Sequence, residues 1–279
     1  MFNLGSKSKR KIIPGFNLAL GYTLFYLSLI VIIPIIGLFI HASNISFSRL
    51  ISLLTEDRVL AALKITFITS FLAVLINLFL GFIVAWSLVR YNFWGKKLMN
   101  SLIDIPFALP TAEAGISISA IYAEDGILGK FFADYGIKIS YTSFGIIIAL
   151  IFVSFPFIVR TLQPVLEDLK KEVEEAATSL GANRWQIFTR IIFPSILPTI
   201  LTSFSVAFAR CLGEYGSVIF IAGNIPLVSE IIPLLIVIKL EQYQIAEAAV
   251  IACFMLIISF SLLFAINILQ KWSRKWDYT

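Results

Sequence analysis

Two ionisable residues of opposite charge, Arg210 and Glu214, stand four positions apart at the end of a long apolar segment. On a helix, this spacing places both side chains on one face. Ionisable groups within apolar spanning segments are costly and often functional, so Arg210 could face a path through the membrane. The favoured alternative is an ion pair within the helix, which lowers the cost of burying both charges. We interpret the nearby Gly213 and Gly216 as packing or bending positions.

The residue types that build catalytic and metal sites are sparse. His41 is the only histidine, and Cys211 and Cys253 both lie in apolar segments, so they offer no disulfide framework. The sequence contains no Gly-rich phosphate loop and no convincing catalytic pair of carboxylates. We therefore expect no enzyme active site on this chain, and no bound nucleotide, cofactor or metal.

Two more charges interrupt apolar segments. Asp104 precedes Pro106, and we expect it to have a structural role near one end of its segment. Pro106 and Pro110 are expected to break a helix and free carbonyl groups that the bundle or water must satisfy. Lys64 is expected to pair with an acid or to extend its amino group toward a helix end.

The hydropathy of the sequence predicts the helices that carry these residues. Of the 279 residues, 59% are hydrophobic and 14% are charged, and the mean hydropathy is +0.92. Soluble domains carry about 25% charged residues, so this chain belongs in a bilayer. A spanning helix needs about 20 apolar residues. Six segments meet this length: 16–40, 60–89, 98–122, 143–162, 191–222 and 245–269. The apolar segment 231–240 is too short to cross and is predicted to be re-entrant or packed against the bundle.

Basic residues are distributed unevenly between the loops. We count fifteen before the first segment, between the second and third, after the fourth and after the sixth, against six in the opposite loops. Arg90 is assigned to the loop between the second and third segments, and Arg160 to the loop after the fourth. The positive-inside rule then places both termini and the loop after the fourth segment in the cytoplasm. It also accounts for the net charge of +5 without nucleic acid. The first segment exceeds the apolar core of a signal peptide and is expected to be retained.

The cytoplasmic loop at about 167–194 has helix signals of its own. Residues 167–179 favour a helix with an acidic start. Gly181 is placed to end this helix in the left-handed conformation. Asn183 and Gln186 predict a capping box for a second helix. Trp185, Ile187 and Phe188 supply an apolar surface, and Ala176 and Ala177 are small enough to let another protein approach closely. The alternative is a solvent-exposed loop whose charged residues only keep it hydrated, with no binding role.

The loop carries a spaced motif. Glu-Ala-Ala is followed by three residues, Gly, nine residues and Ile-x-Phe-Pro, through Glu175, Ala176, Ala177, Gly181, Ile191 and Pro194. It resembles the EAA loop of ABC-importer permeases, although Phe193 stands where Leu is usual. The resemblance implies an all-α integral membrane protein: a six-helix polytopic bundle of the type-1 ABC-importer permease kind, with both termini cytoplasmic. In that family the loop docks into an ATPase, which makes Glu175, Ala176, Ala177 and Gly181 coupling residues, not catalytic ones.

Three other segments resemble one particular subfamily of these permeases. Residues 102–115, 210–230 and 233–242 resemble sulfate/thiosulfate permeases of the T type, and the similarity covers about residues 15 to 270. Molybdate permeases share Gly213, Glu214, Gly223 and Asn224, so residues 228–242 are the more sulfate-like evidence. The implied function is a permease subunit of an ATP-driven sulfate/thiosulfate importer. A molybdate/tungstate permease and an ATP-independent anion transporter are the alternatives.

The resemblance also implies partners and domain limits. Residues 1–58 would hold the N-terminal tail, first helix and external loop, 59–269 the type-1 transmembrane domain, and 270–279 a cytoplasmic tail. The chain would pair with a homologous permease as a heterodimer. Two copies of an ABC ATPase would bind the ATP, and a soluble sulfate-binding protein would deliver the anion. The membrane would be a bacterial inner membrane or a chloroplast envelope membrane.

Overall fold

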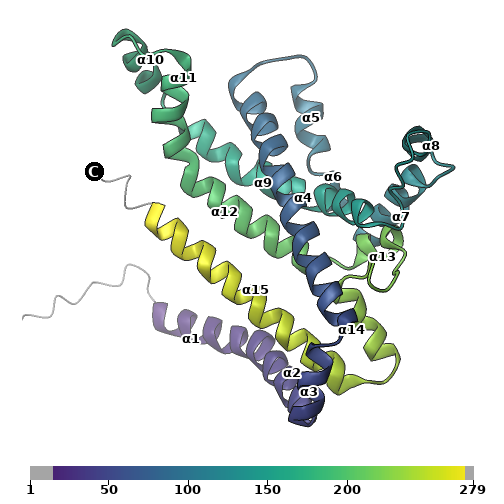
Figure 1. The fold of residues 1–279 in the computed structure, drawn as a ribbon. Helices are drawn as coiled ribbons and strands as arrows, with labels where there is room; N and C mark the ends of the chain where they lie inside the picture. Colours follow the sequence, from purple (N-terminus) through teal and green to yellow (C-terminus); the bar gives the residue numbers. More distant parts are fainter. Residues whose placement is uncertain (1–14, 274–279) are drawn as a thin grey trace, which may run out of the picture.

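The computed structural model describes the backbone of residues 15–273 and the side chains of residues 15–270. Within that range the regular secondary structure is helical (Figure 1). The predicted cytoplasmic termini lie largely outside the described residues, because the structure describes neither 1–14 nor 274–279.

Five helices are long and apolar enough to cross a membrane. Two of them are continuous helices that contain a π-helical turn. The first comprises α1 (Phe16–Leu27), η1 (Ser28–Ile32) and α2 (Ile33–Ser43), and the fourth comprises α11 (Arg184–Ile187), η2 (Phe188–Ile192) and α12 (Phe193–Leu212). The other three are α4 (Asp57–Arg90), α9 (Ser143–Asp168) and α15 (Ile245–Ser273).

Each π-helical turn ends two residues before a proline, Pro34 in the first long helix and Pro194 in the fourth. Proline has no N–H, and its ring clashes with the carbonyl one turn earlier. A π turn widens the helix by one residue, so it accommodates the ring without ending the helix. The two apolar segments therefore continue past their prolines.

The third predicted span, 98–122, is not one helix. It is divided into α5 (Lys96–Leu102), α6 (Ile105–Ala108) and α7 (Thr111–Tyr122). Asp104 precedes the first residue of α6, and Pro110 has an extended backbone before α7. The described residues therefore contain five helices long enough to cross a membrane and this broken segment in the place of the third predicted span. The prolines interrupt the helix, as predicted.

The fifth predicted span also has different limits. The helix starts at Arg184, before the predicted 191, and ends at Leu212. A short break then leads to α13 (Gly216–Ala222). The segment predicted to be too short to cross forms α14 (Ile232–Glu241), which packs against α15 and α4, as expected. Three further short helices are α3 (Phe47–Leu54), α8 (Ile127–Ala133) and α10 (Lys171–Ser179).

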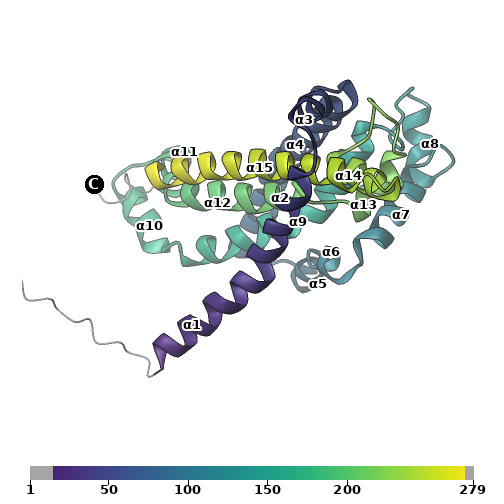
Figure 2. The same ribbon diagram turned by 90° about the horizontal axis from the view of Figure 1, so that it is seen from below.

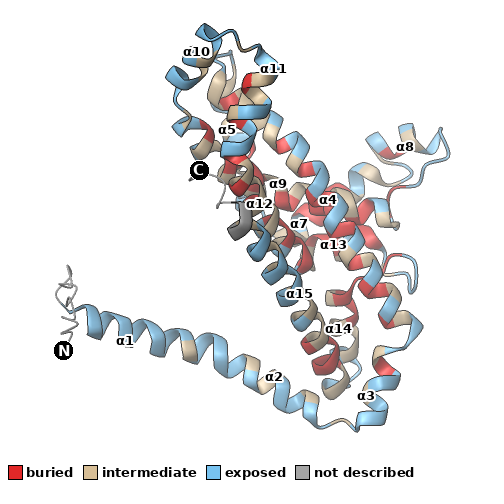
Figure 3. Ribbon diagram, turned by 60° about the vertical axis from the view of Figure 1, so that its left-hand side comes forward, coloured by how far each residue is buried: buried red, intermediate tan, exposed pale blue. Residues whose placement is uncertain are grey.

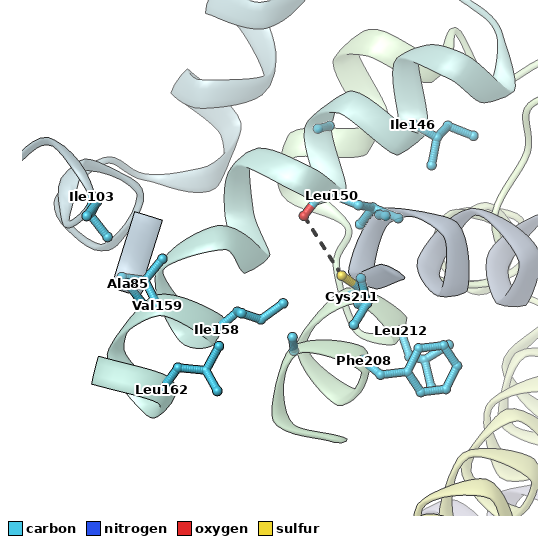
Figure 4. Close-up of a cluster of buried hydrophobic side chains, with 14 of the residues drawn as sticks. Ala85, Ile103, Ile146, Leu150, Ile158, Val159, Leu162, Phe208, Cys211 and Leu212 are labelled. Atoms are coloured by element: carbon cyan, nitrogen blue, oxygen red, sulfur yellow. Dashed lines mark hydrogen bonds between the residues drawn. The ribbon is translucent and has the colours of Figure 1, made fainter. Parts of the chain in front are cut away.

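The core is built around α4 and α9, with α12 packed against both. Gly81 lets these helices approach: a Cβ at this position would lie 2.8 Å from Ile158 Cγ2. Asn77 Nδ2 donates hydrogen bonds to Ile151 O at 2.8 Å and Ser154 Oγ at 2.9 Å. Small residues and polar links of this kind are typical of helix packing in membranes. Figure 4 shows part of the buried cluster, with Cys211 directed at Leu150 O.

The first long helix is set apart from this core. None of its apolar window is buried, whereas 56% of the window in α9 is buried. Its second half, α2, packs against α15, and α1 diverges from the bundle (Figures 2 and 3). The chain alone therefore leaves a long apolar helix to be covered by lipid or another protein.

Candidate coupling loop and pathway residues

The loop between the second and third core helices, α9 and α12, holds a separate short helix, α10. It begins later than predicted: Glu167 and Asp168 belong to the end of α9, and the backbone is extended at Leu169 and Lys170. Leu169 packs against the core, so the chain is anchored there before α10 starts. The predicted helix 167–179 was therefore wrong at its first residues, because its acidic start spans two helices.

The turn that ends α10 follows the sequence prediction closely. Gly181 is left-handed, with φ at +86°. Ala182 N donates to Ala177 O at 3.0 Å and Gly181 N donates to Thr178 O at 2.9 Å, the two hydrogen bonds of a Schellman motif. Asn183 and Gln186 then form the predicted capping box at the start of α11. Local sequence thus fixes a helix, a tight turn and a second helix.

The two faces of α10 have different surroundings. Glu175, Ala176 and Gly181 are exposed, whereas Ala177 is half-buried against the core. The four predicted coupling residues therefore lie on α10 and in the turn that ends it, at an end of the molecule (Figure 1).

The exposed apolar side chains of this loop differ in part from the prediction. Trp185 is 73% exposed, as expected of an apolar docking surface, but Ile187 is buried and Phe188 is half-buried in the core. Leu180, which sequence reasoning missed, is 90% exposed. Its place immediately before the turn glycine was the available signal, because a C-cap residue projects from the end of its helix. Leu180 and Trp185 therefore give the loop an unpartnered apolar tip.

An ion pair links α10 to the bundle. The guanidinium of Arg90, the last residue of α4, contacts the carboxylate of Glu174. It also lies 4.9 Å from the centre of the Trp86 ring. Sequence reasoning placed Arg90 only among the basic loop residues, since a contact between residues 84 positions apart leaves no local pattern.

Arg210, in the last turn of α12, and Glu214, just after it, form the predicted ion pair. Arg210 Nη1 lies 2.5 Å from Glu214 Oε2. The pair spans the break between α12 and α13 rather than one helix, because α12 ends at Leu212. Glu214 is 2% exposed, and its other oxygen accepts hydrogen bonds from Ser217 N and Ser217 Oγ, each at 2.9 Å. Its carboxylate therefore neutralises Arg210 and caps α13 at the same time.

The two glycines near this pair have different surroundings. Gly213 lies at the bend that follows α12, where an added Cβ would meet only Ala209 O at 4.0 Å. At Gly216, an added Cβ would lie 2.2 Å from Thr111 Oγ1 of α7. Close packing therefore accounts for Gly216, whereas neither the backbone conformation of Gly213, with φ at −91°, nor the space around it requires a glycine.

Asp104 has the structural role expected of it. Its carboxylate binds the guanidinium of Arg160 through two hydrogen bonds, of 2.8 and 2.5 Å. Arg160 was assigned to the loop after the fourth segment, and this was wrong: it lies within α9, where it also binds Asn100 and Gln163. The predicted pairing of Lys64 is not found among the described residues; the side chain is exposed on α4.

A second paired arginine, Arg58, holds the opposite end of α4 and was not predicted. Its Nε and Nη2 donate to the two carboxylate oxygens of Glu230, at 2.8 and 2.6 Å, and Glu230 is fully buried. Thr66 Oγ1 accepts a hydrogen bond from Ile232 N at 2.9 Å, at the start of α14. These contacts fix the segment before α14 on α4. Among the residues that the structure describes, no cluster of three His, Cys, Asp or Glu residues could hold a metal.

Residues 77–276 match the family of binding-protein-dependent transport system inner membrane components. The chain is 42% identical over 264 residues to the Sulfate transport system permease protein CysT of Escherichia coli, covering 95% of each chain. It is 46% identical to the Probable sulfate transport system permease protein cysT of Chlorokybus atmophyticus, covering 89% of this chain and 87% of the relative. The corresponding CysT protein of Synechocystis is 44% identical, with 91% and 89% covered.

The fold is also similar to solved structures. A bacterial ABC transporter involved in the import of the acidic polysaccharide alginate matches with a TM-score of 0.76 at 17% identity, covering 92% of this chain and 94% of that one. The same transporter, in complex with its alginate pentasaccharide-bound periplasmic protein, gives a TM-score of 0.74 at 19% identity, covering 91% and 93%. The chain is a multi-pass membrane protein that belongs to the binding-protein-dependent transport system inner membrane components, as an ABC-importer permease of the sulfate-permease (CysT) type.

Proposed function

We propose that this permease imports sulfate or thiosulfate at the expense of ATP hydrolysed by a separate ABC ATPase, to which it couples through the loop α10–α11. The observation that carries the coupling is the form of this loop. A short helix, closed by a Schellman motif and a capping box, projects from one end of the bundle with Glu175, Ala176 and Gly181 exposed. The sulfate assignment rests on relatives that are 42–46% identical over most of the chain.

The exposed apolar residues at the tip of the loop indicate that it binds a protein partner and is not simply a loop surrounded by water. Burying a large apolar side chain against a partner is favourable, so large apolar side chains that are exposed together mark an interaction site. Leu180 and Trp185 expose 90% and 73% of their surface on either side of the turn. Because the turn holds them in fixed positions, little ordering is needed when an ATPase surface covers them.

A second permease would form the rest of the translocation pathway. The first long helix is unburied by its own chain, and Arg210 is 32% exposed beside its buried partner Glu214. A homologous permease would cover apolar surface and complete a path along which Arg210, Gly213 and Glu214 lie. A soluble sulfate-binding protein would deliver the anion from outside. The chain itself would bind no cofactor, since the ATPase holds the ATP. The membrane is the bacterial inner membrane or the chloroplast envelope membrane.

The proposal is tested by uptake of labelled sulfate into proteoliposomes that contain this chain, its partner permease, the ATPase and the binding protein. Uptake is expected to require ATP and to be lost in Glu175→Arg and Gly181→Asp. Matched controls are Glu175→Gln, which keeps the size of the native side chain without its charge, and Gly181→Asn, which has the size of the Asp variant without its charge. Asn and Asp both have access to the left-handed backbone, so the second pair of variants differs in charge alone. Both controls are expected to retain uptake.

Each other outcome has a definite meaning. ATP-independent uptake, or full activity in both charge variants, overturns the coupling role and favours an ATP-independent anion transporter. Uptake of molybdate or tungstate without sulfate keeps the coupling mechanism and overturns the substrate. Competition among sulfate, thiosulfate and molybdate in the same vesicles makes this distinction.

A further inference from the structure

The short helix α10 has one inward face. Glu174 and Ala177, one turn apart, are its two half-buried residues, and the other seven are exposed. Ala177 makes an apolar contact with the core, and Glu174 makes the ion pair with Arg90. An apolar contact can slide, whereas an ion pair with hydrogen bonds is directional. The pair is therefore the more position-specific of these two attachments between α10 and the bundle.

Arg90 is itself held in place. Its side chain is 12% exposed and that of Glu174 is 26% exposed, so water screens the pair only in part. The guanidinium lies over Trp86, one turn earlier on α4, in a cation–π contact. Its Nε is buried, and no described group accepts a hydrogen bond from it. An unsatisfied buried donor is costly, so the position of Arg90 is retained at some cost in stability.

The helix that Arg90 terminates extends through the whole bundle. α4 has 34 residues, which corresponds to a length of about 50 Å at 1.5 Å per residue. It packs against α9 and α12, and at its other end Arg58 holds the fully buried Glu230. α4 thus carries a paired arginine at each end, one bound to the coupling helix and one to the segment before α14.

We propose that the Arg90–Glu174 ion pair transmits the displacement of α10 to α4, and through α4 to the opposite end of the bundle. This inference rests on the proposed coupling function, and it makes Arg90 a positioning residue that acts through α10. The face of α10 that carries Glu175 and Ala176 stays free for the ATPase, while the face that carries Glu174 pulls or pushes α4. The link is distinct from the docking motif, because neither Arg90 nor Glu174 belongs to it.

The test compares uptake with ATP hydrolysis in the same proteoliposomes of the complete transporter. Arg90→Met and Glu174→Gln are expected to leave assembly and ATP hydrolysis near wild type. Sulfate uptake per ATP hydrolysed is expected to fall by roughly tenfold, within the usual range of coupling between sites. The charge exchange Arg90→Glu with Glu174→Arg is expected to recover uptake relative to either reversal alone.

The matched control is Arg49→Met, which removes an arginine–glutamate pair of the same type at the far end of the molecule. Arg49 pairs with Glu247 at 2.6 Å and does not touch α10. It is expected to leave uptake per ATP unchanged. The inference is overturned if Arg90→Met keeps wild-type uptake per ATP. It is also overturned if assembly, hydrolysis and uptake fall together and the charge exchange restores none of them, because the pair is then only structural.

A second measurement separates this inference from the proposed function. Spin labels at Lys171→Cys on α10 and Ile83→Cys on α4 report the distance between the helices with and without a non-hydrolysable ATP analogue, independently of any substrate. In the wild-type background the distance is expected to stay constant, because the helices move together, and in Arg90→Met it is expected to change or broaden. Identical distances in both backgrounds overturn the link. Absence of ATP-dependent sulfate uptake in the wild-type complex, with the distance result as expected, overturns only the transport assignment.

Discussion

At the scale of single residues, the turn at Gly181 sets the form of the coupling loop. Its φ of +86° costs a residue with a Cβ about 1–2 kcal/mol, although an added Cβ would meet no atom within 4 Å. The penalty therefore comes from the backbone conformation and not from a steric clash of the added Cβ with neighbouring atoms. Asn tolerates the left-handed region, whereas β-branched residues do not.

Gly181→Asn is accordingly expected to keep the protection of the α10 amides, and Gly181→Val to lose it. Hydrogen exchange of residues 171–182 in the purified chain measures this difference. Equal protection in the two variants would contradict the role of the left-handed turn.

The Arg210–Glu214 pair makes a second prediction at this scale. Glu214 is buried and also caps α13, so removing it leaves Arg210 without a partner and Ser217 without an acceptor. We expect Glu214→Leu to destabilise the protein by about 3 kcal/mol or more. The double variant Arg210→Met with Glu214→Leu is expected to be less destabilised, because no unpaired charge remains. Thermal unfolding in detergent measures both, and strictly additive losses would refute the coupling.

At the scale of elements, the packing of α7 on α13 depends on glycines that meet the facing helix. An added Cβ at Gly115 would lie 2.4 Å from Ser217 O, a backbone atom that cannot rotate away. At Gly216 the nearest atom is Thr111 Oγ1, which belongs to a movable side chain. Gly213 has open space around it.

We therefore expect stability to fall in the order Gly213→Ala, Gly216→Ala, Gly115→Ala, with the last losing about 1–3 kcal/mol through overpacking. Midpoints of thermal unfolding for the three purified variants check this order. A Gly115→Ala protein as stable as Gly213→Ala would show that α7 and α13 are not packed as described.

At the scale of the whole molecule, the long helices carry the coupling loop and α8 at different ends of the bundle (Figure 1). The positive-inside rule assigns the end with α10 to the cytoplasm. The native cysteines, Cys211 and Cys253, are buried, so a cysteine introduced on the surface can be labelled selectively.

In cells that lack the ATPase subunit, which would otherwise cover Leu180, a membrane-impermeant maleimide is expected to label Ile127→Cys while the cells are intact. It is expected to label Leu180→Cys only after the membrane is opened. Both positions are highly exposed, at 87% and 90%, so access to the reagent and not burial decides the result. Labelling of Leu180→Cys in intact cells would reverse the orientation of the whole chain.

The sequence by itself determined what depends on local chemistry. Hydropathy located the long helices, and the caps around Gly181 and Asn183 followed from residue types within a few positions. The Arg210–Glu214 pair could be predicted because its partners stand four residues apart. The spaced motif placed the proposed coupling residues on one loop.

Only the tertiary structure decided what depends on distant partners. The prolines in residues 98–122 predicted a broken helix, but the partner of Asp104 at the break is Arg160 of α9, which is 56 positions away. The pair between Arg90 and Glu174 joins residues that are remote in sequence. Such contacts arise when packed helices bring charged ends together, and no local pattern encodes which ends will meet.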